Sequence, residues 1–190
     1  MRYKFIPLSS LLALSKSKNQ IRKLLKTFKC ELNPDVETFL HHKAITFEEK
    51  GRGRTYLLLD LYSSPPAVMG YYTIAIHSLK IKNLDPETQE ELVGERGKGR
   101  KWEYIPCYLI GQLGKSDLCL RRGVGGKILK HAIKTIEKGY QIFNGRFILL
   151  DAVNDSRVLE FYRTHDFMEI EAITSEKESI KMIYWLVEGE

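Results

Sequence analysis

The stretch "LRRGVGGKILKHA", residues 120–132, places three glycines directly before a helical pattern. Glycine costs about 1 kcal/mol in a helix interior relative to alanine, so glycines gathered here indicate a place that needs bare backbone. A helix start carries unpaired N–H groups and the positive end of the helix dipole, which together bind phosphates. The stretch therefore predicts a phosphate-binding turn in which Arg121 and Arg122 add charge, with a simple tight turn as the alternative.

Two common nucleotide motifs do not fit this stretch. A Walker A loop requires G-x-x-x-x-G-K-[ST], which is absent from the sequence. In the dinucleotide motif G-x-G-x-x-G, the third glycine stands two residues further on than Gly126 does here. The loop from Ser116 to Arg122 is also long for that turn. Neither nucleotide-binding fold is therefore expected.

Hydrophobic periodicity on both sides of the stretch predicts a mixed α+β protein. Strands are expected over residues 3–8, 54–62, 67–79, 102–114, 146–153, 168–173 and 179–188. Helices are expected over residues 9–28 with a break near 15–19, and over 33–51, 86–92, 125–139 and 155–167. The remainder of 80–101 reads as a long polar loop. Because the sequence has no internal repeat and no composition break, we expect residues 1–190 to form a single domain.

This order of elements resembles the GCN5-related N-acetyltransferase (GNAT) superfamily. Gly123 and Gly125 match the two glycines of its acetyl-CoA motif, a strand, a Q/R-x-x-G-x-G/A loop and a helix. The segment "VNDSRVLEFYRTHDF", residues 153–167, resembles its second signature, an asparagine turn before a helix that ends in Phe-Tyr-x-x-x-Gly-Phe. The resemblance implies a mixed, mostly antiparallel central sheet flanked by helices, with the acetyl-CoA loop between a central strand and a helix.

Three further segments are similar to one branch of this superfamily, the acetyltransferase toxins of toxin–antitoxin pairs, which modify aminoacyl-tRNA. These segments are residues 28–44, 103–117 and 148–167. The similarity implies acetyl-CoA as co-substrate without a metal, and charged tRNA as the amine substrate. It also implies an antitoxin partner and a homodimer. Two alternatives remain: an N-acetyltransferase of a small amine or protein amine, and a non-catalytic module that binds CoA or nucleic acid.

The resemblance also assigns site residues. Loop amides hold the CoA pyrophosphate and the preceding strand pairs with the pantetheine arm, with an oxyanion donor near Leu113 or Gly114. The implied cofactor-binding residues are Leu113, Gly114, Lys115, Arg121, Arg122, Gly123, Val124, Gly125, Gly126, Asn154 and Phe161. Tyr162 stands at the position of the family's catalytic tyrosine, which serves the departing thiolate. A phenol with a pKa near 10 is protonated at pH 7 and suits an acid; an aromatic packing role is the alternative.

The sequence departs from the family pattern at several positions. Leu120 stands where the motif has Gln or Arg, and we expect CoA binding to survive because backbone N–H groups hold the anion. Asp166 replaces the glycine before Phe167, which puts the geometry of that turn in question. Gln112, Gly114 and Ser116 replace Arg, Ala and Asp of the branch, and the change at Ser116 bears on how the loop is supported.

The whole chain carries a net charge of +6, and basic residues dominate its first part. No acidic residue precedes Glu31, whereas the cations there are Arg2, Lys4, Lys16, Lys18, Arg22, Lys23, Lys26 and Lys29. A second basic cluster, "GERGKGRK", spans residues 94–101. Such patches attract polyanions and favour an RNA-borne amine, although a solvated surface explains them equally well.

Three cysteines at wide spacing, without a C-x-x-C pair, indicate a reducing compartment and argue against zinc. The first 15 residues lack a signal-peptide cleavage site, and no apolar run approaches the ~18 residues of a membrane span. We therefore predict a cytoplasmic protein without a membrane segment.

The general base is open at this stage. The α-amine of an aminoacyl-tRNA has a low pKa, so water suffices as base, with His165, Glu103 and Asp117 as side-chain candidates. A covalent route through Cys107 or Cys119 is disfavoured. Cys107 lies in an apolar strand, and neither cysteine has a histidine partner in its sequence context.

Overall fold

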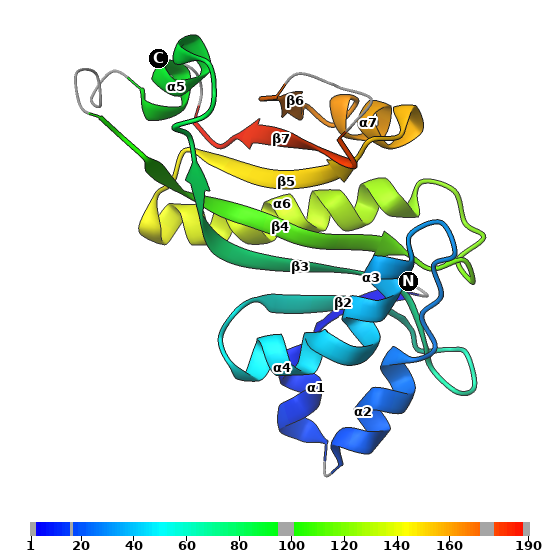
Figure 1. Ribbon diagram of the computed structural model, residues 1–190. Helices are drawn as coiled ribbons and strands as arrows, with labels where there is room; N and C mark the ends of the chain where they lie inside the picture. Colours follow the sequence, from blue (N-terminus) through cyan, green and yellow to red (C-terminus); the bar gives the residue numbers. More distant parts are fainter. Residues whose placement is uncertain (1–2, 16, 95–100, 172–176, 188–190) are drawn as a thin grey trace. The chain divides into compact units, whose positions relative to one another are not determined.

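Seven strands form one sheet in the order β1-β2-β3-β4-β5-β7-β6, with helices on its faces (Figure 1). This computed structural model describes residues 3–15, 17–94, 101–171 and 177–187. Pairing is antiparallel for β1–β2, β2–β3, β5–β7 and β6–β7, and parallel for β4–β5. The predicted fold class, a mostly antiparallel α+β sheet flanked by helices, is confirmed.

The strands are β1 (Tyr3–Pro7), β2 (Arg54–Asp60), β3 (Ala67–Lys80), β4 (Tyr104–Lys115), β5 (Phe147–Val153), β6 (Met168–Glu169) and β7 (Ser179–Trp185). The helices are α1 (Leu8–Leu14), α2 (Lys18–Leu25), α3 (Pro34–Thr38), the π-helix η1 (Phe39–Lys43), α4 (Ala44–Glu49), α5 (Pro86–Val93), α6 (Val124–Phe143) and α7 (Ser156–Arg163). Within the described residues, no helix is long and apolar enough to cross a membrane.

The chain divides into two compact units. Unit 1 comprises Met1–Ala75 and Ile110–Lys134, and unit 2 comprises Ile76–Leu109 and Thr135–Glu190. Three elements, β3, β4 and α6, pass from one unit into the other. The expectation of a single domain stays a prediction.

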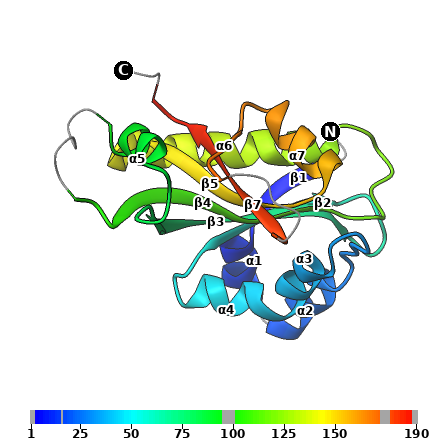
Figure 2. The same ribbon diagram turned by 45° about the horizontal axis from the view of Figure 1, so that its top comes forward.

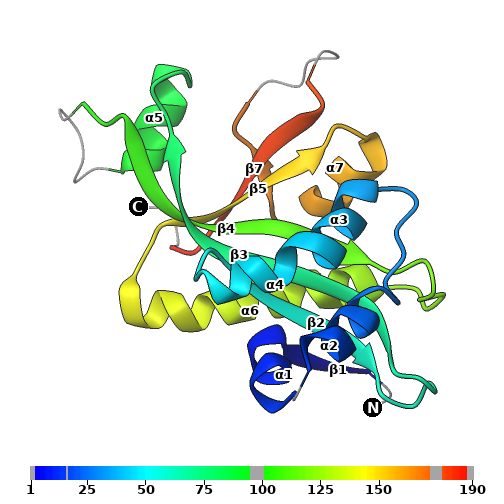
Figure 3. The same cartoon turned by 60° about the horizontal axis from the view of Figure 1, so that its bottom comes forward.

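The core of unit 1 lies between its helices and one face of its strands. Figures 2 and 3 show α1–α4 gathered on one face of β2 and β3, and Figure 2 shows α6 on the opposite face. Side chains from α1–α4, including Leu25 and Leu40, pack on Leu57 and Tyr71 in a buried cluster. The Tyr71 hydroxyl donates a hydrogen bond to the Val36 carbonyl at 2.6 Å, which fixes α3 on the sheet.

The core of unit 2 gathers around β5. Phe147 and Leu149 of β5 pack with Ile105 and Cys107 of β4. Leu92 of α5 joins this cluster and is fully buried, so the short helix predicted over 86–92 anchors the connection between β3 and β4.

One expectation about the helices is confirmed and two need adjustment. The expected break divides α1 from α2, as predicted. The expected helix over 33–51 contains the π-turn η1. The helix expected to end at Gly139 continues to Phe143, so this glycine lies inside the helix, next to the Tyr108 ring. In the basic cluster at 94–101, residues 95–100 lie outside the described residues, as do residues 172–173 of the expected strand 168–173.

Candidate functional site

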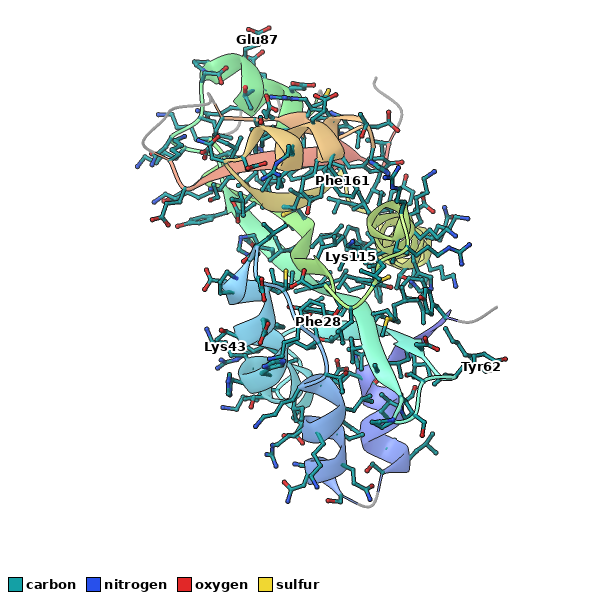
Figure 4. All side chains as sticks on the ribbon, turned by 90° about the vertical axis from the view of Figure 1, so that its right-hand side faces the viewer. Phe28, Lys43, Tyr62, Glu87, Lys115 and Phe161 are labelled. Atoms are coloured by element: carbon teal, nitrogen blue, oxygen red, sulfur yellow. The ribbon has the colours of Figure 1, made fainter. Side chains whose placement is uncertain are left out.

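The end of β4 leads directly into the loop of residues 116–123 in unit 1, which we call the glycine loop. The parallel ladder with β5 covers Tyr108 with Ile148 and Leu109 with Leu149, and β4 then continues through Ile110–Lys115. Leu113 and Lys115 of this strand are predicted cofactor-binding residues. Leu113 is half-buried. Lys115, labelled in Figure 4, donates a hydrogen bond from its ammonium group to the Cys119 carbonyl at 3.2 Å. Lys115, an exposed residue, therefore braces the loop through this hydrogen bond.

Gly114 is a glycine because β4 lies against α3 and the segment before it. A Cβ at Gly114 would lie 2.5 Å from Val36 Cγ1 and 3.0 Å from Phe28 Cζ. Both distances are shorter than ordinary contacts, so a larger residue requires β4 or α3 to shift. The replacement of the branch's alanine by Gly114 is thus explained by packing.

Helix α6 begins at a glycine in a left-handed conformation. Gly123 has φ +73°, which residues with a Cβ rarely adopt, and no atom lies within 4 Å of where its Cβ would stand. The first bond into the helix runs from the Lys127 N–H to the Gly123 carbonyl at 3.3 Å. The N–H groups of residues 124–126 therefore precede the helical ladder and are available to a ligand. Val124 itself is buried, which fixes the helix start to the core.

Cations surround this helix start. Arg121, Arg122 and Lys127 are exposed, and within the described residues no carboxylate forms a salt bridge with either arginine. Open backbone amides, the positive end of a 20-residue helix and unpaired guanidinium groups together suit a diphosphate. The residues present therefore fit the pyrophosphate of acetyl-CoA, as the loop motif predicts.

The second group of predicted residues lies in unit 2, at the start of α7. Asp155 caps the helix: its Oδ1 accepts hydrogen bonds from the N–H groups of Arg157 at 2.9 Å and Val158 at 3.3 Å. Asn154 before it ties β5 to the segment preceding β7, since its N–H donates to the Glu178 carbonyl and its Nδ2 to the Lys177 carbonyl, each at 3.0 Å. Its predicted role toward the cofactor stays a prediction.

Tyr162 of α7 is held in an aromatic cluster. Its ring lies 5.1 Å from the Phe161 ring and 5.6 Å from the Phe167 ring, centroid to centroid. Burial raises the pKa of Tyr162 to about 12. The part of the chain that the structure describes gives its hydroxyl no hydrogen-bond partner. A buried phenol that keeps its proton and has no partner inside the protein suits a proton donor to a ligand.

The turn after α7 has the geometry that the family's glycine would give. Asp166 adopts φ +67°, and the Phe167 N–H donates to the Tyr162 carbonyl at 3.2 Å. The replacement of glycine by Asp166 thus leaves the turn in place, and Phe167 still packs against Tyr162.

The other candidate residues have structural partners. His165 Nδ1 lies 2.7 Å from the Phe161 carbonyl, and Glu103 lies 3.8 Å from Lys80. Burial raises the pKa of the Cys107 thiol to about 12, and Cys119 is buried, so neither thiol suits a nucleophile. Across the described ranges, no group of His, Cys, Asp and Glu side chains could hold a metal ion.

Sequence reasoning missed how the glycine loop is anchored. Asp117, expected as a base candidate, accepts a hydrogen bond from the Glu31 N–H at 2.8 Å, and Ser116 accepts one from the Lys29 N–H at 3.3 Å. The family resemblance marks residues 28–44, but it does not indicate that part of this segment anchors the glycine loop.

Comparison with known proteins supports the same fold. No family model matches the chain. AtaT complexed with acetyl-methionyl-tRNAfMet has a TM-score of 0.70 at 16% identity, over 96% of this chain and 94% of that chain. A tyrosine-to-phenylalanine variant of KacT has a TM-score of 0.70 at 14% identity, over 97% and 95%. The chain therefore has the same fold as AtaT and KacT.

A third similar structure contains bound ligands. A tyrosine-to-phenylalanine variant of the AtaT toxin, bound to the C-terminus of the antitoxin AtaR and to acetyl-CoA, has a TM-score of 0.68. Its identity is 15%, over 97% of this chain and 94% of that chain. The fold is therefore one that binds acetyl-CoA in another protein, and at this identity the comparison establishes the fold alone.

Proposed function

We propose that this protein is an acetyl-CoA-dependent N-acetyltransferase, an acyltransferase that acts on a primary amine by direct attack. The observation that carries the proposal is the start of α6: Gly123 in a left-handed conformation, open backbone amides at 124–126 and exposed arginines. It stands directly after β4 in a fold that AtaT uses with acetyl-CoA. Geometry, motif and fold therefore point to the same ligand.

Each predicted residue has a role in this proposal. The amides of residues 123–126, with Arg121 and Arg122, hold the pyrophosphate, and the backbone of Leu113, Gly114 and Lys115 pairs with the pantetheine arm. When bound, acetyl-CoA supplies a thioester whose carbonyl carbon an amine attacks. An N–H of β4 near Leu113 or Gly114 donates to the oxygen that becomes negative.

One proton transfer remains to be assigned, and the family resemblance gives it to Tyr162. Forming the amide bond releases one proton from the amine, and breaking the C–S bond leaves a thiolate that needs one. The Tyr162 hydroxyl holds a proton for the thiolate sulfur, and its raised pKa keeps that proton in place at neutral pH. Water takes the proton of an amine with a low pKa. Asn154 and Phe161 complete the predicted contacts.

For the acceptor, we propose the amino group of an aminoacyl-tRNA. AtaT is solved with acetyl-methionyl-tRNAfMet. The basic face of α2 supports the same substrate: Arg22, Lys23 and Lys26 are exposed, whereas Ile21 and Leu25 are buried in the core. Since the apolar side of α2 is used inside the protein, its outer side offers charge to a polyanion rather than an apolar face to a membrane. A small amine or a protein amine is the rival acceptor.

An antitoxin is the candidate protein partner. AtaT is solved with the C-terminus of AtaR, and a KacTA–DNA complex has a TM-score of 0.57 to this chain at 19% identity, over 83% of this chain and 82% of that one. A homodimer and a cytoplasmic location stay predictions.

The test is transfer of labelled acetyl from acetyl-CoA to two acceptors side by side, charged tRNA and a panel of small amines and peptides. We expect label on tRNA that is lost on deacylation, with a steep fall as salt rises because phosphate contacts release counterions. Label on small amines or peptides alone would keep the enzyme and reject the RNA. CoA binding without any turnover would instead favour a regulatory module.

A further inference from the structure

Residues Lys29–Glu31 of unit 1 have no helix or strand, yet three of their backbone groups bond to the start of the glycine loop. The Lys29 N–H donates to Ser116 Oγ at 3.3 Å, and the Lys29 carbonyl accepts from the Asp117 N–H at 2.8 Å. The Glu31 N–H donates to Asp117 Oδ2 at 2.8 Å. We call this set, Lys29–Glu31 with Ser116 and Asp117, the clasp.

On the loop side, the clasp is continuous with the sheet. Ser116 has no exposed surface, and its N–H donates to the Met69 carbonyl at 2.9 Å. Its carbonyl accepts from the Cys119 N–H at 2.9 Å, and its Oγ accepts from the Leu118 N–H at 3.3 Å. The loop is thus fixed from Ser116 to Cys119, whereas residues 120–123, which lead into α6, are exposed.

On the other side, the clasp is continuous with α3. Glu37 Oε2 accepts from the Cys30 N–H at 2.9 Å, and Glu37 Oε1 accepts from Lys29 Nζ at 3.0 Å. The hydrogen bond from the Cys30 N–H, and after it the one from Lys29, hold the pKa of Glu37 below its usual range. The carboxylate therefore stays charged while it accepts these bonds. Glu37 of α3 and Asp117 of the loop therefore hold adjacent amides of one short segment.

We propose that Asp117 is a positioning residue for acetyl-CoA: through the clasp it holds the glycine loop in the arrangement that receives the pyrophosphate. This inference rests on the proposed function. Asp117 is exposed, and among the described residues its side chain makes one hydrogen bond, to the Glu31 N–H. Its loss therefore loosens the clasp without opening the core. By reciprocity, a ligand that needs the ordered loop also stabilises the clasp.

The matched variants are Asp117→Ala, Asp117→Asn and Asp85→Ala. Asn keeps an oxygen acceptor for the Glu31 N–H. Asp85 makes the same kind of bond in unit 2, where it accepts from the Thr88 N–H at 2.9 Å at the start of α5. Asp85→Ala therefore controls for the loss of one carboxylate-to-amide bond at an exposed site.

The measurements are calorimetric Kd for CoA and the kinetic constants for acetyl-CoA with whichever acceptor the transfer assay identifies. We expect Asp117→Ala to raise Kd and KM together by about ten-fold with kcat unchanged, since a carboxylate-to-amide bond is a strong one. Asp117→Asn should recover most of the affinity, and Asp85→Ala should bind CoA as the wild type does. Wild-type affinity in Asp117→Ala would overturn the inference.

The second measurement is hydrogen exchange on the wild-type protein, which does not depend on whether a variant folds. We expect CoA to slow exchange of the Lys29 and Glu31 amides, and unchanged exchange at both would overturn the inference. If wild-type protein bound CoA and these readouts did not respond, only the clasp would fail. If wild-type protein did not bind CoA at all, the proposed function would fail and the inference with it.

Discussion

Helices α6 and α7 both follow a central strand of the sheet, yet they begin in opposite ways. Helix α7 starts at Asp155, whose carboxylate occupies the N–H groups of Arg157 and Val158. Helix α6 starts at Gly123, which has no side chain to offer and leaves the amides of residues 124–126 open. A side-chain cap occupies the first N–H groups of a helix and leaves none for a ligand. An uncapped helix start leaves these N–H groups able to bind an anion.

Three further helices, α2, α3 and α5, follow the capped pattern, whereas α1 begins after Pro7 without a side-chain cap. Ser17, Asn33 and Asp85 each accept a hydrogen bond from the first turn of α2, α3 and α5. The sequence thus supplies capping side chains readily, and their replacement by glycine at α6 is a local choice. In the proposed reaction, α6 binds the cofactor through its backbone and α7 contributes a side chain, Tyr162.

The largest effect is expected at Tyr162. Tyr162→Phe removes the proton for the thiolate and should lower kcat by about 10²–10⁴-fold while leaving the Kd for CoA unchanged. The assay is CoA release with the identified acceptor, with calorimetry for binding. Unchanged turnover would remove Tyr162 from the mechanism and leave it as a packing residue against Phe167.

The pH dependence gives a second reading of the same residue. Because burial raises the pKa of Tyr162 to about 12, the acid form is present below that value and is lost as pH rises through it. Between pH 7 and about pH 10, the ordinary value for tyrosine, kcat should therefore show no fall that depends on Tyr162. An alkaline fall in this range that Tyr162→Phe abolished would contradict the assignment.

The next effect separates the bare helix start from an ordinary turn. Gly123→Val and Gly51→Val place a β-branched residue at φ +73° and +64°, both in open space. Each should cost about 1–2 kcal/mol of folding free energy. Only Gly123→Val should also weaken CoA binding, by about ten-fold or more, as calorimetry would measure. Equal affinities in the two variants would reduce the glycine loop to a tight turn.

A smaller effect is expected where the helix start is closed. Asp155→Ala removes the cap of α7 and should lower Tm by roughly 2–4 °C without changing the Kd for CoA. Hydrogen bonds from Arg157 hold the pKa of Asp155 below its usual range, so this stabilisation is present above the usual carboxylate pKa and lost as pH falls through the lowered one. A Tm difference that persisted in strong acid would point to a cause other than the cap.

Local signals carried most of the fold and part of the site. Apolar runs predicted β2 and β5, and the glycines of residues 123–126 predicted a bare turn before α6, where the structure shows Gly123 in a left-handed conformation. The π-turn at Phe39–Lys43 escaped because one extra residue per turn leaves the hydrophobic pattern of a helix almost unchanged. Gly139 misled the prediction of the end of α6 because a single glycine is also tolerated inside a helix, at a cost of about 1 kcal/mol.

The clasp escaped for a different reason. Lys29 and Ser116 are 87 residues apart, and the bond between them joins a backbone N–H, which almost every residue has, to a serine hydroxyl. Such a contact leaves no compositional mark. Sequence can therefore locate a candidate phosphate-binding loop before it can locate the residues that hold that loop in place.

The smallest effect concerns the end of α7, where Asp166 adopts the φ of +67° that the family's glycine would adopt freely. Asp166→Gly should remove a local strain of about 1 kcal/mol, partly offset by the entropy of glycine in the unfolded chain, for a net gain of about 0.5 kcal/mol. Asp166→Val cannot relax in this way and should destabilise the protein, as urea unfolding of both variants would measure. The turn places Phe167 against Tyr162. If the turn positions the Tyr162 ring, kcat should be highest in Asp166→Gly and lowest in Asp166→Val, as stability is. A more stable Asp166→Gly variant with wild-type kcat would instead show that Tyr162 is held by its burial in α7 alone.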